Sequence, residues 1–231
     1  MNSPTLAQSL LWTAVTVASY LAGLGLRRMA RNHALANPAL LAMVLVAVAL
    51  RLTHTPYSFY FQASRVLTLL LAPATVALGI PLAKHFALVR QSWRGVGISL
   101  LAGSVVSMVS GVMLVRLLGG SRELALTILP KAVTTPIAMS VASQIGGDPA
   151  LTATLAIIGG IIAAVTMQAV LGRLRVTNGQ AIGLAAGTAG SGIAAAQVAT
   201  LGDGPAAFAA IGIGLNGMLT ALLAPWLASL C

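Results

Sequence analysis

The chain has 231 residues, of which 58% are hydrophobic and only 7% are charged. Soluble chains carry about 25% charged residues, so this composition excludes an ordinary soluble domain and indicates a multi-pass membrane protein. Thirteen lysines and arginines stand against three acids, which gives a formal net charge of +10. The cations lie mainly in short loops between apolar runs, where they act as topological signals and contact anionic lipid, so we expect no nucleic-acid partner.

The first half of the chain predicts three apolar segments. Residues 5–26 follow no charged leader and precede no small-residue cleavage site, so we expect a retained helix rather than a removed signal peptide. Residues 38–50 are short for a crossing, and the aromatic cluster at 55–61 suits a membrane interface. Residues 66–82 form a third run that contains prolines.

The second half predicts five further segments. They are two plain spans at 96–118 and 149–171, two segments interrupted by glycine or proline at 124–145 and 181–201, and a last run at 205–230. We therefore expect an all-α membrane protein with about eight hydrophobic segments, six to eight of them crossings. The whole chain, residues 1–231, is interpreted as a single polytopic membrane domain.

An internal repeat relates the two interrupted segments. A shift of 56 positions places Gly146 on Gly202 and Pro149 on Pro205, within seven identities over twenty-one positions. The repeat units cover about residues 124–172 and 181–227, and each consists of an interrupted segment, a short turn and a long helix. Paired interrupted segments are a pointer to the substrate site of a secondary transporter.

The charges favour an inverted repeat. Arg27 and Arg28 place the first inter-helix loop in the cytoplasm. Arg173 and Arg175 are cytoplasmic as well only if residues 124–145 enter the membrane and return without crossing it. If that segment crosses, the two units are parallel instead.

The most informative stretch contains Lys131, Thr134, Thr135 and Pro136. Pro136 lacks a backbone donor and clashes with the preceding turn, so a straight helix is not expected here. One interpretation is a broken helix that forms a substrate site. The other is a Pro-kinked packing helix whose lysine extends to the interface. For Lys131 with its two threonines we favour the substrate site, because a lysine buried in the membrane is costly.

The second copy and the last run supply further candidates for substrate binding. They are Thr188, Gly190 and Ser191 in the second interrupted segment, and Asn216, a polar amide within the last span. Glycines here either let backbone approach a ligand or let helices pack closely, and for the glycines alone packing is the favoured interpretation.

A cation, hydroxyl groups and the N-terminal end of a half-helix suit one small carboxylate. A dicarboxylate would ask for a second buried cation, and the sequence offers none. An enzyme is not expected, because no metal-ligand cluster, acid pair or nucleophile motif occurs, and we expect neither a cofactor nor a metal.

Several of these motifs together resemble the LrgB/CidB family. They are K-A-V-T-T-P-I-A-M at 131–139, Q-I-G-G at 144–147, G-L-A-A-G-T-A at 183–189 and G-L-N-G at 214–217. The resemblance covers nearly the whole chain. Family members usually carry Ser-His after the Gly-Thr-Ala motif, where this chain has Gly190 and Ser191. The resemblance therefore does not extend to a histidine that could carry a proton.

The resemblance implies a carrier for small monocarboxylates of the glycolate, glycerate, pyruvate and lactate class. The alternative is a holin-like oligomeric membrane protein that regulates murein hydrolase activity and cell lysis, as the family was first described. A third possibility is a structural subunit that needs a small LrgA-type membrane partner. We expect a homodimer, because closed twofold assemblies dominate, in the cytoplasmic (inner) membrane of a bacterium.

Overall fold

The structure is a computed structural model, and it describes residues 4–29, 38–67, 69–70, 73, 83–84 and 86–230. Every regular element within these residues is helical, which confirms the predicted all-α fold. The chain divides into two compact units, Met1–Ala77 and Leu78–Cys231. The single domain expected over residues 1–231 stays a prediction.

The first unit contains three helices: α1 (Leu6–Met29), α2 (Pro38–Leu52) and α3 (Tyr57–Ala63). The ring of Tyr60 in α3 packs edge-on against Trp12 in α1, with 5.6 Å between ring centroids. The Tyr60 hydroxyl also lies 3.0 Å from the Thr16 hydroxyl. The axes of α2 and α3 differ by 118°. The aromatic cluster expected at a membrane interface therefore forms a short helix that packs on α1.

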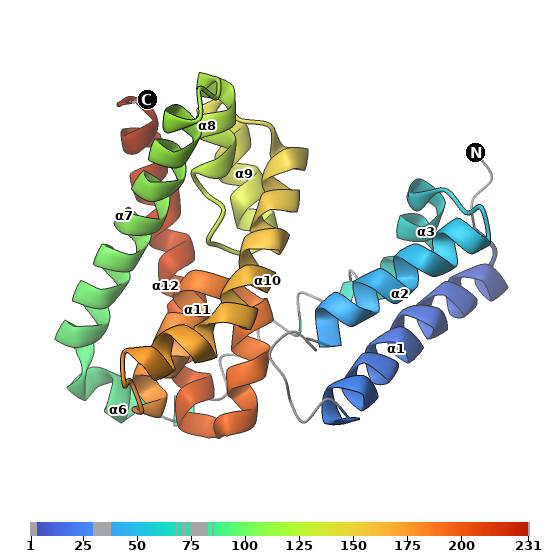
Figure 1. Cartoon of the computed structure of the whole chain (residues 1–231), viewed down its shortest axis with the longest axis horizontal. Helices are drawn as coiled ribbons and strands as arrows, with labels where there is room; N and C mark the ends of the chain where they lie inside the picture. Colours follow the sequence, from blue (N-terminus) through green and yellow to red (C-terminus); the bar gives the residue numbers. More distant parts are fainter. Residues whose placement is uncertain are drawn as a thin grey trace. The chain divides into compact units, whose positions relative to one another are not determined.

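The second unit is built from three long helices, α7 (Trp93–Leu117), α10 (Pro149–Arg173) and α12 (Asp203–Ala228) (Figure 1). The remaining elements are α6 (Phe86–Gln91), α8 (Arg122–Ile128), α9 (Thr135–Ile145), α11 (Gly179–Val198) and the 3-10 turn η1 (Ala199–Leu201). At a rise of 1.5 Å per residue each long helix extends about 38 Å, more than the roughly 30 Å of a hydrocarbon core.

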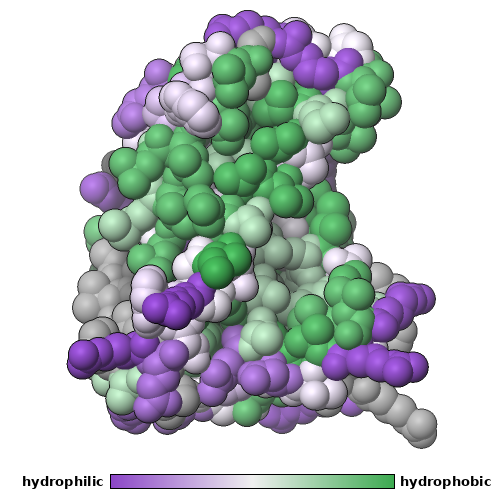
Figure 2. All heavy atoms as spheres, turned by 90° about the vertical axis from the view of Figure 1, so that its left-hand side faces the viewer, coloured by the Kyte–Doolittle hydropathy of each residue, from purple (hydrophilic) through white to green (hydrophobic). Residues whose placement is uncertain are grey.

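Five of the described helices are long and apolar enough to cross a membrane, or six if α2 and α3 form one bent span. The face that carries α7 shows a hydrophobic band between hydrophilic upper and lower ends (Figure 2). These features confirm a multi-pass membrane protein. The count of eight segments stays a prediction, and most of the expected run at 66–82 lies outside the described residues.

The first interrupted segment consists of α8, a non-helical stretch at 129–134 and α9. Pro136 lies in the first turn of α9, after the N-cap residue Thr134, so the break precedes the proline. Gly146 ends α9 in the left-handed conformation (φ 86°), which a glycine adopts without steric cost. The Asp148 carboxylate then caps α10 by accepting hydrogen bonds from the first backbone N–H groups of that helix.

The two halves of this segment return to the same end of the unit. The Thr127 hydroxyl, near the end of α8, accepts a hydrogen bond from the Asp148 N–H at 2.9 Å. The Thr152 hydroxyl in α10 donates to the Thr127 carbonyl at 2.9 Å. The segment therefore forms a hairpin beside the N-terminal end of α10, near the top of Figure 1.

The second interrupted segment, α11 with η1, also folds back. Ser191 has φ 49° and ψ −140°, which breaks the helix at that point. A Cβ on Gly179, the first residue of α11, would lie 2.9 Å from Cγ of Pro205, near the start of α12. Because η1 ends just before α12 begins, both ends of this segment lie at the N-terminal end of α12. By length and composition alone, the segment Gly179–Leu201 would also be long and apolar enough to cross a membrane.

Candidate functional site

Lys131 lies in the non-helical stretch between α8 and α9, and its side chain extends toward α7. Its ammonium donates a hydrogen bond to the Ser107 carbonyl at 2.6 Å and lies 3.4 Å from the Ser107 hydroxyl. A Cβ on Gly111, one turn further along α7, would come within 2.7 Å of Lys131 Nζ. The Lys131 ammonium can therefore lie against α7 because Gly111 has no side chain.

No acidic side chain neutralises Lys131. The chain has three acids, Glu123, Asp148 and Asp203, all of them among the described residues, and none forms an ion pair with this ammonium. Two neutral oxygen atoms of Ser107 are its partners. A half-buried cation with only neutral partners is suited to an anionic ligand.

Asn216, in the middle of α12, joins both interrupted segments. Its side-chain amide nitrogen donates hydrogen bonds to the Ala132 carbonyl at 2.9 Å and to the Thr188 carbonyl at 3.0 Å. The Ser104 hydroxyl of α7 donates to its amide oxygen. Asn216 is 1% exposed, so these bonds lie in the protein interior. The sequence offered Asn216 as a candidate binding residue, and the structure brings it together with both interrupted segments.

Both breaks lie at one level of the second unit, beside the middle of α10. A Cβ on Gly159 would lie 3.9 Å from the Lys131 carbonyl oxygen, and one on Gly160 would lie 3.2 Å from the Gly190 carbonyl oxygen. Ser104 and Asn216 stand near the middle of α7 and α12 respectively. The backbone carbonyls at the two breaks therefore lie near the middle of the three long helices α7, α10 and α12.

The other candidate residues fall into two groups. Thr188 is half-buried and its hydroxyl donates to the Leu184 carbonyl at 2.8 Å, so its hydroxyl hydrogen is used within α11. Thr134, Thr135 and Ser191 are half-buried, and their hydroxyls form no hydrogen bond with any described residue. These three hydroxyls remain available to a ligand.

Pro136 and Gly190 contribute backbone shape rather than polar side chains. Pro136 is exposed in the first turn of α9, whereas Gly190 is buried. A Cβ on Gly190 would lie 2.4 Å from Cβ of Ala194 and 3.1 Å from Cβ of Ala163. Gly190 thus lets the two halves of α11 and helix α10 pack closely beside the break.

Ser104 and Ser107 are the site residues that the sequence did not single out. Both lie on α7, which looks like a plain apolar span, and they contact Asn216 and Lys131 across 112 and 24 residues of chain. The sequence signal that could have identified them is the presence of serines within an otherwise apolar span. Their spacing of three residues places them on neighbouring positions of one helix face.

Basic residues gather at the end of the second unit where α11 and α12 begin. The Lys84 ammonium lies 3.8 Å from the Asp203 carboxylate at the start of α12. Arg173 is the last residue of α10, shortly before α11 starts, and Arg94 is in the first turn of α7. The first halves of α7, α11 and α12 pack together through one hydrophobic cluster: Val96, Leu100, Leu184, Phe208 and Ile211. Lys84, Arg94 and Arg173 therefore share one end of the unit.

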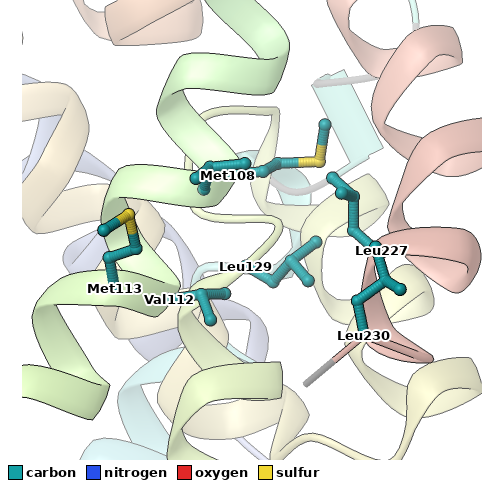
Figure 3. A pocket seen from close by; sticks show the side chains of 7 residues that line it. Met108, Val112, Met113, Leu129, Leu227 and Leu230 are labelled. Atoms are coloured by element: carbon teal, nitrogen blue, oxygen red, sulfur yellow. The ribbon is translucent and has the colours of Figure 1, made fainter.

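A groove of about 210 Å³ near the opposite end is lined by apolar side chains only (Figure 3). Its lining residues come from α7, the start of the first break and the end of the chain: Met108, Val109, Val112, Met113, Leu129, Leu227 and Leu230. Its lining offers no polar side chain to an anion, so it is not the candidate site.

The chain matches the LrgB-like family over residues 16–230. It is 30% identical to an antiholin-like protein LrgB of Bacillus mycoides over 211 residues, 91% of this chain and 92% of that protein. It is 29% identical over the same length to an antiholin-like protein LrgB of Bacillus cereus. An uncharacterized protein of Haemophilus influenzae is 30% identical over 190 residues, 82% of each chain.

No solved structure matches the chain. The family match includes all of the second unit except its last residue, and with it both interrupted segments and Asn216. The resemblance seen in the sequence motifs is thereby confirmed, and the chain belongs to the LrgB-like family.

Proposed function

We propose that the protein is a secondary carrier or facilitator, rather than an enzyme, for small monocarboxylates of the glycolate, glycerate, pyruvate and lactate class. It would act in the cytoplasmic membrane of a bacterium. The observation that supports this most is Lys131, a half-buried cation without an acidic partner, at the level where two broken segments meet. Broken helices at the membrane midplane are a common way to build a substrate site.

The chemistry at this level suits one carboxylate. A bound carboxylate would accept from the Lys131 ammonium in place of the neutral oxygens of Ser107, because hydrogen bonds between charged groups are the stronger ones. The free hydroxyls of Thr134 and Thr135 lie at the N-terminal end of α9, where the helix dipole also favours an anion. A single half-buried ammonium, that of Lys131 among the described residues at this level, favours a monocarboxylate over a dicarboxylate.

We also propose that the two repeat units are inverted. The hairpin of α8 and α9 lies beside the N-terminal end of α10, and the hairpin of α11 lies beside the N-terminal end of α12. Arg122, at the start of α8, donates to the Ala228 carbonyl at the C-terminal end of α12. These contacts support hairpins that enter from opposite ends. With its basic residues, the end near Lys84 would then face the cytoplasm.

The second candidate is a holin-like membrane protein that regulates murein hydrolase activity and lysis. The name that the Bacillus relatives carry, antiholin-like protein LrgB, favours this function more than transport. That name specifies no substrate. A holin-like role would need neither a half-buried lysine nor two broken segments that meet at one asparagine.

Proteoliposomes separate the two candidates. The carrier proposal predicts saturable uptake of labelled pyruvate or glycolate, reduced by excess unlabelled lactate and absent for a dicarboxylate. Leakage of a large dye, without saturation or competition, would instead support the holin-like protein. Each result is compared with liposomes that contain no protein.

We further propose that the protein forms a homodimer and that a small LrgA-type membrane protein is a candidate partner. Closed twofold assembly is the commonest arrangement of identical chains. Mass measurement in detergent checks the first point, because a monomer at all concentrations would contradict it. Uptake by the chain reconstituted alone tests whether the LrgA-type partner is needed for transport.

A further inference from the structure

A groove between α7 and the first half of α11 extends along the second unit. It has a volume of about 400 Å³, and its lining includes Ser99, Gly103 and Ser107 from α7 with Leu184, Ala185 and Thr188 from α11. The three α7 residues are spaced by four positions, so they form one stripe along a single helix face. Three hydroxyl groups within apolar segments distinguish this groove from the apolar groove of Figure 3.

The groove leads to the Lys131 ammonium. Ser107 lines it, and the Ser107 hydroxyl lies 3.4 Å from Lys131 Nζ. Exposure decreases along the stripe, because Ser99 is exposed whereas Gly103 and Ser107 are half-buried. The groove therefore runs from the surface of the unit to the Lys131 ammonium at the level of the breaks.

The outer part of the groove lies at the basic end. Ser99 is in the second turn of α7, shortly after Arg94, and α11 begins shortly after Arg173. A concentration of positive charge near the mouth of a groove attracts anions and raises their local concentration. The charge at the mouth and the charge at the inner end thus favour the same class of ligand.

Gly103 lines the groove at the middle of the α7 stripe, where α7 and α11 lie close together. A Cβ at this position would come within 3.2 Å of Thr188 Cγ2 on the facing helix. That distance is shorter than an ordinary carbon contact of about 3.5–4.0 Å, so any side chain here would narrow the space between α7 and α11.

We infer that the α7–α11 groove is the path by which a small carboxylate reaches Lys131 from the basic end, and that Gly103 limits the size of the acid that passes. The inference rests on the proposed function. It assigns a new role to residues of α7 that the motifs of the sequence do not include.

The path is tested by labelling single cysteines with a charged, membrane-impermeant methanethiosulfonate that carries a sulfonate. The variants are Ser99→Cys and Ser107→Cys in a Cys231→Ser background, with Val106→Cys as the matched control on α7. Val106 is 64% exposed but does not line the groove, so lipid is expected to cover it. We expect reaction at Ser99→Cys and Ser107→Cys, slowed by pyruvate at Ser107→Cys, and none at Val106→Cys.

Labelling reports on the path even where uptake fails, so the two proposals can be separated. Reaction at both serine positions but not at Val106→Cys supports an anion-accessible path whether or not uptake is saturable. Saturable uptake together with an unreactive Ser107→Cys overturns the path and leaves the carrier proposal intact. Reaction at all three positions, Val106→Cys included, also overturns it, because the groove would then not be the hydrated feature of α7.

The size limit is tested with Gly103→Val and the control Gly97→Ala, at a position of α7 where an added Cβ meets nothing within 4 Å. We expect Gly103→Val to slow uptake of a three-carbon acid at least tenfold more than uptake of glycolate. Gly97→Ala should leave the ratio of the two rates unchanged. An unchanged ratio in Gly103→Val would overturn the assignment of Gly103.

Discussion

Asn216 connects α12 with α7 and with both interrupted segments in the interior of the second unit. The sequence identified it as a polar amide in an apolar span and so as a substrate ligand. In the structure both of its N–H donors serve backbone carbonyls, one from each interrupted segment. Lipid cannot satisfy such carbonyls, so a partner from the protein is required. The contacts of Asn216 favour a positioning role, in which it holds the two breaks in register for the groups that bind the acid.

Replacement of Asn216 by leucine tests this role. Asn216→Leu keeps the size of the side chain but removes the hydrogen bonds to the Ala132 and Thr188 carbonyls, so we expect the free energy of unfolding to fall by about 1–3 kcal/mol. Ser104→Ala removes only the bond to the amide oxygen and should cost less, about 1 kcal/mol. Reversible unfolding in mixed detergent micelles measures both. A leucine variant as stable as the parent protein would contradict the positioning role.

At the scale of elements, the closest packing is between α11 and α12. A Cβ on Gly187 would lie 2.1 Å from the Ala209 carbonyl oxygen, and one on Gly183 would lie 2.2 Å from the Pro205 carbonyl oxygen. Because the two backbones touch, the first halves of these helices run side by side without intervening side chains. This is the small-residue packing that the sequence offered as one interpretation of the glycines.

Alanine substitutions within α11 distinguish glycines that are needed for close helix packing from glycines that are not. Gly187→Ala places a methyl group against backbone that cannot move away cheaply, so we expect it to destabilise the protein by about 1–3 kcal/mol or more. Gly192→Ala is the matched control, since an added Cβ there meets nothing within 4 Å. Thermal unfolding of the two variants measures the difference. Equal melting temperatures would contradict the close packing of α11 on α12.

The sequence predicted the long helices well and the breaks in part. The start of α10 was predictable because Asp148 and Pro149 are local capping signals. The break near Pro136 was predictable too, but the proline stands inside the first turn of α9, since it fits a helix start and not a helix interior. The second break was predictable in position, since Gly190 and Ser191 were candidates of the second interrupted segment. The roles of Ser104 and Ser107, by contrast, depend on contacts between distant parts of the chain. Periodicity and capping cannot reveal contacts of that kind.

At the scale of the whole protein, charged residues lie at both ends of the second unit. Contacts among α7, α11 and α12 place Lys84, Arg94 and Arg173 at one end of the second unit. Arg122 and Glu123 lie at the other end, where α8 begins beside the end of α12. The positive-inside rule then favours the Lys84 end as the cytoplasmic one.

Cysteine labelling in cells and in inverted vesicles tests this topology. We expect Arg94→Cys and Arg173→Cys to react from the cytoplasmic side and Arg122→Cys from the opposite side, all in a Cys231→Ser background. The reason is that the α8–α9 hairpin enters and leaves at the same end. Reaction of Arg94→Cys and Arg173→Cys from opposite sides would refute the inverted repeat.

The central claim is that Lys131 binds a small carboxylate where the two broken segments meet. Stabilisation by ligand tests it most directly, because a ligand that binds only the folded protein adds about 2.7 kcal/mol at 100 times its dissociation constant. The measurement is thermal unfolding of the purified protein with increasing pyruvate or glycolate, on the parent chain and on Lys131→Ala. We predict a dose-dependent rise in melting temperature for the parent chain and none for a folded Lys131→Ala. An equal rise in both proteins, or no rise with any two- or three-carbon acid in the parent chain, would contradict the claim.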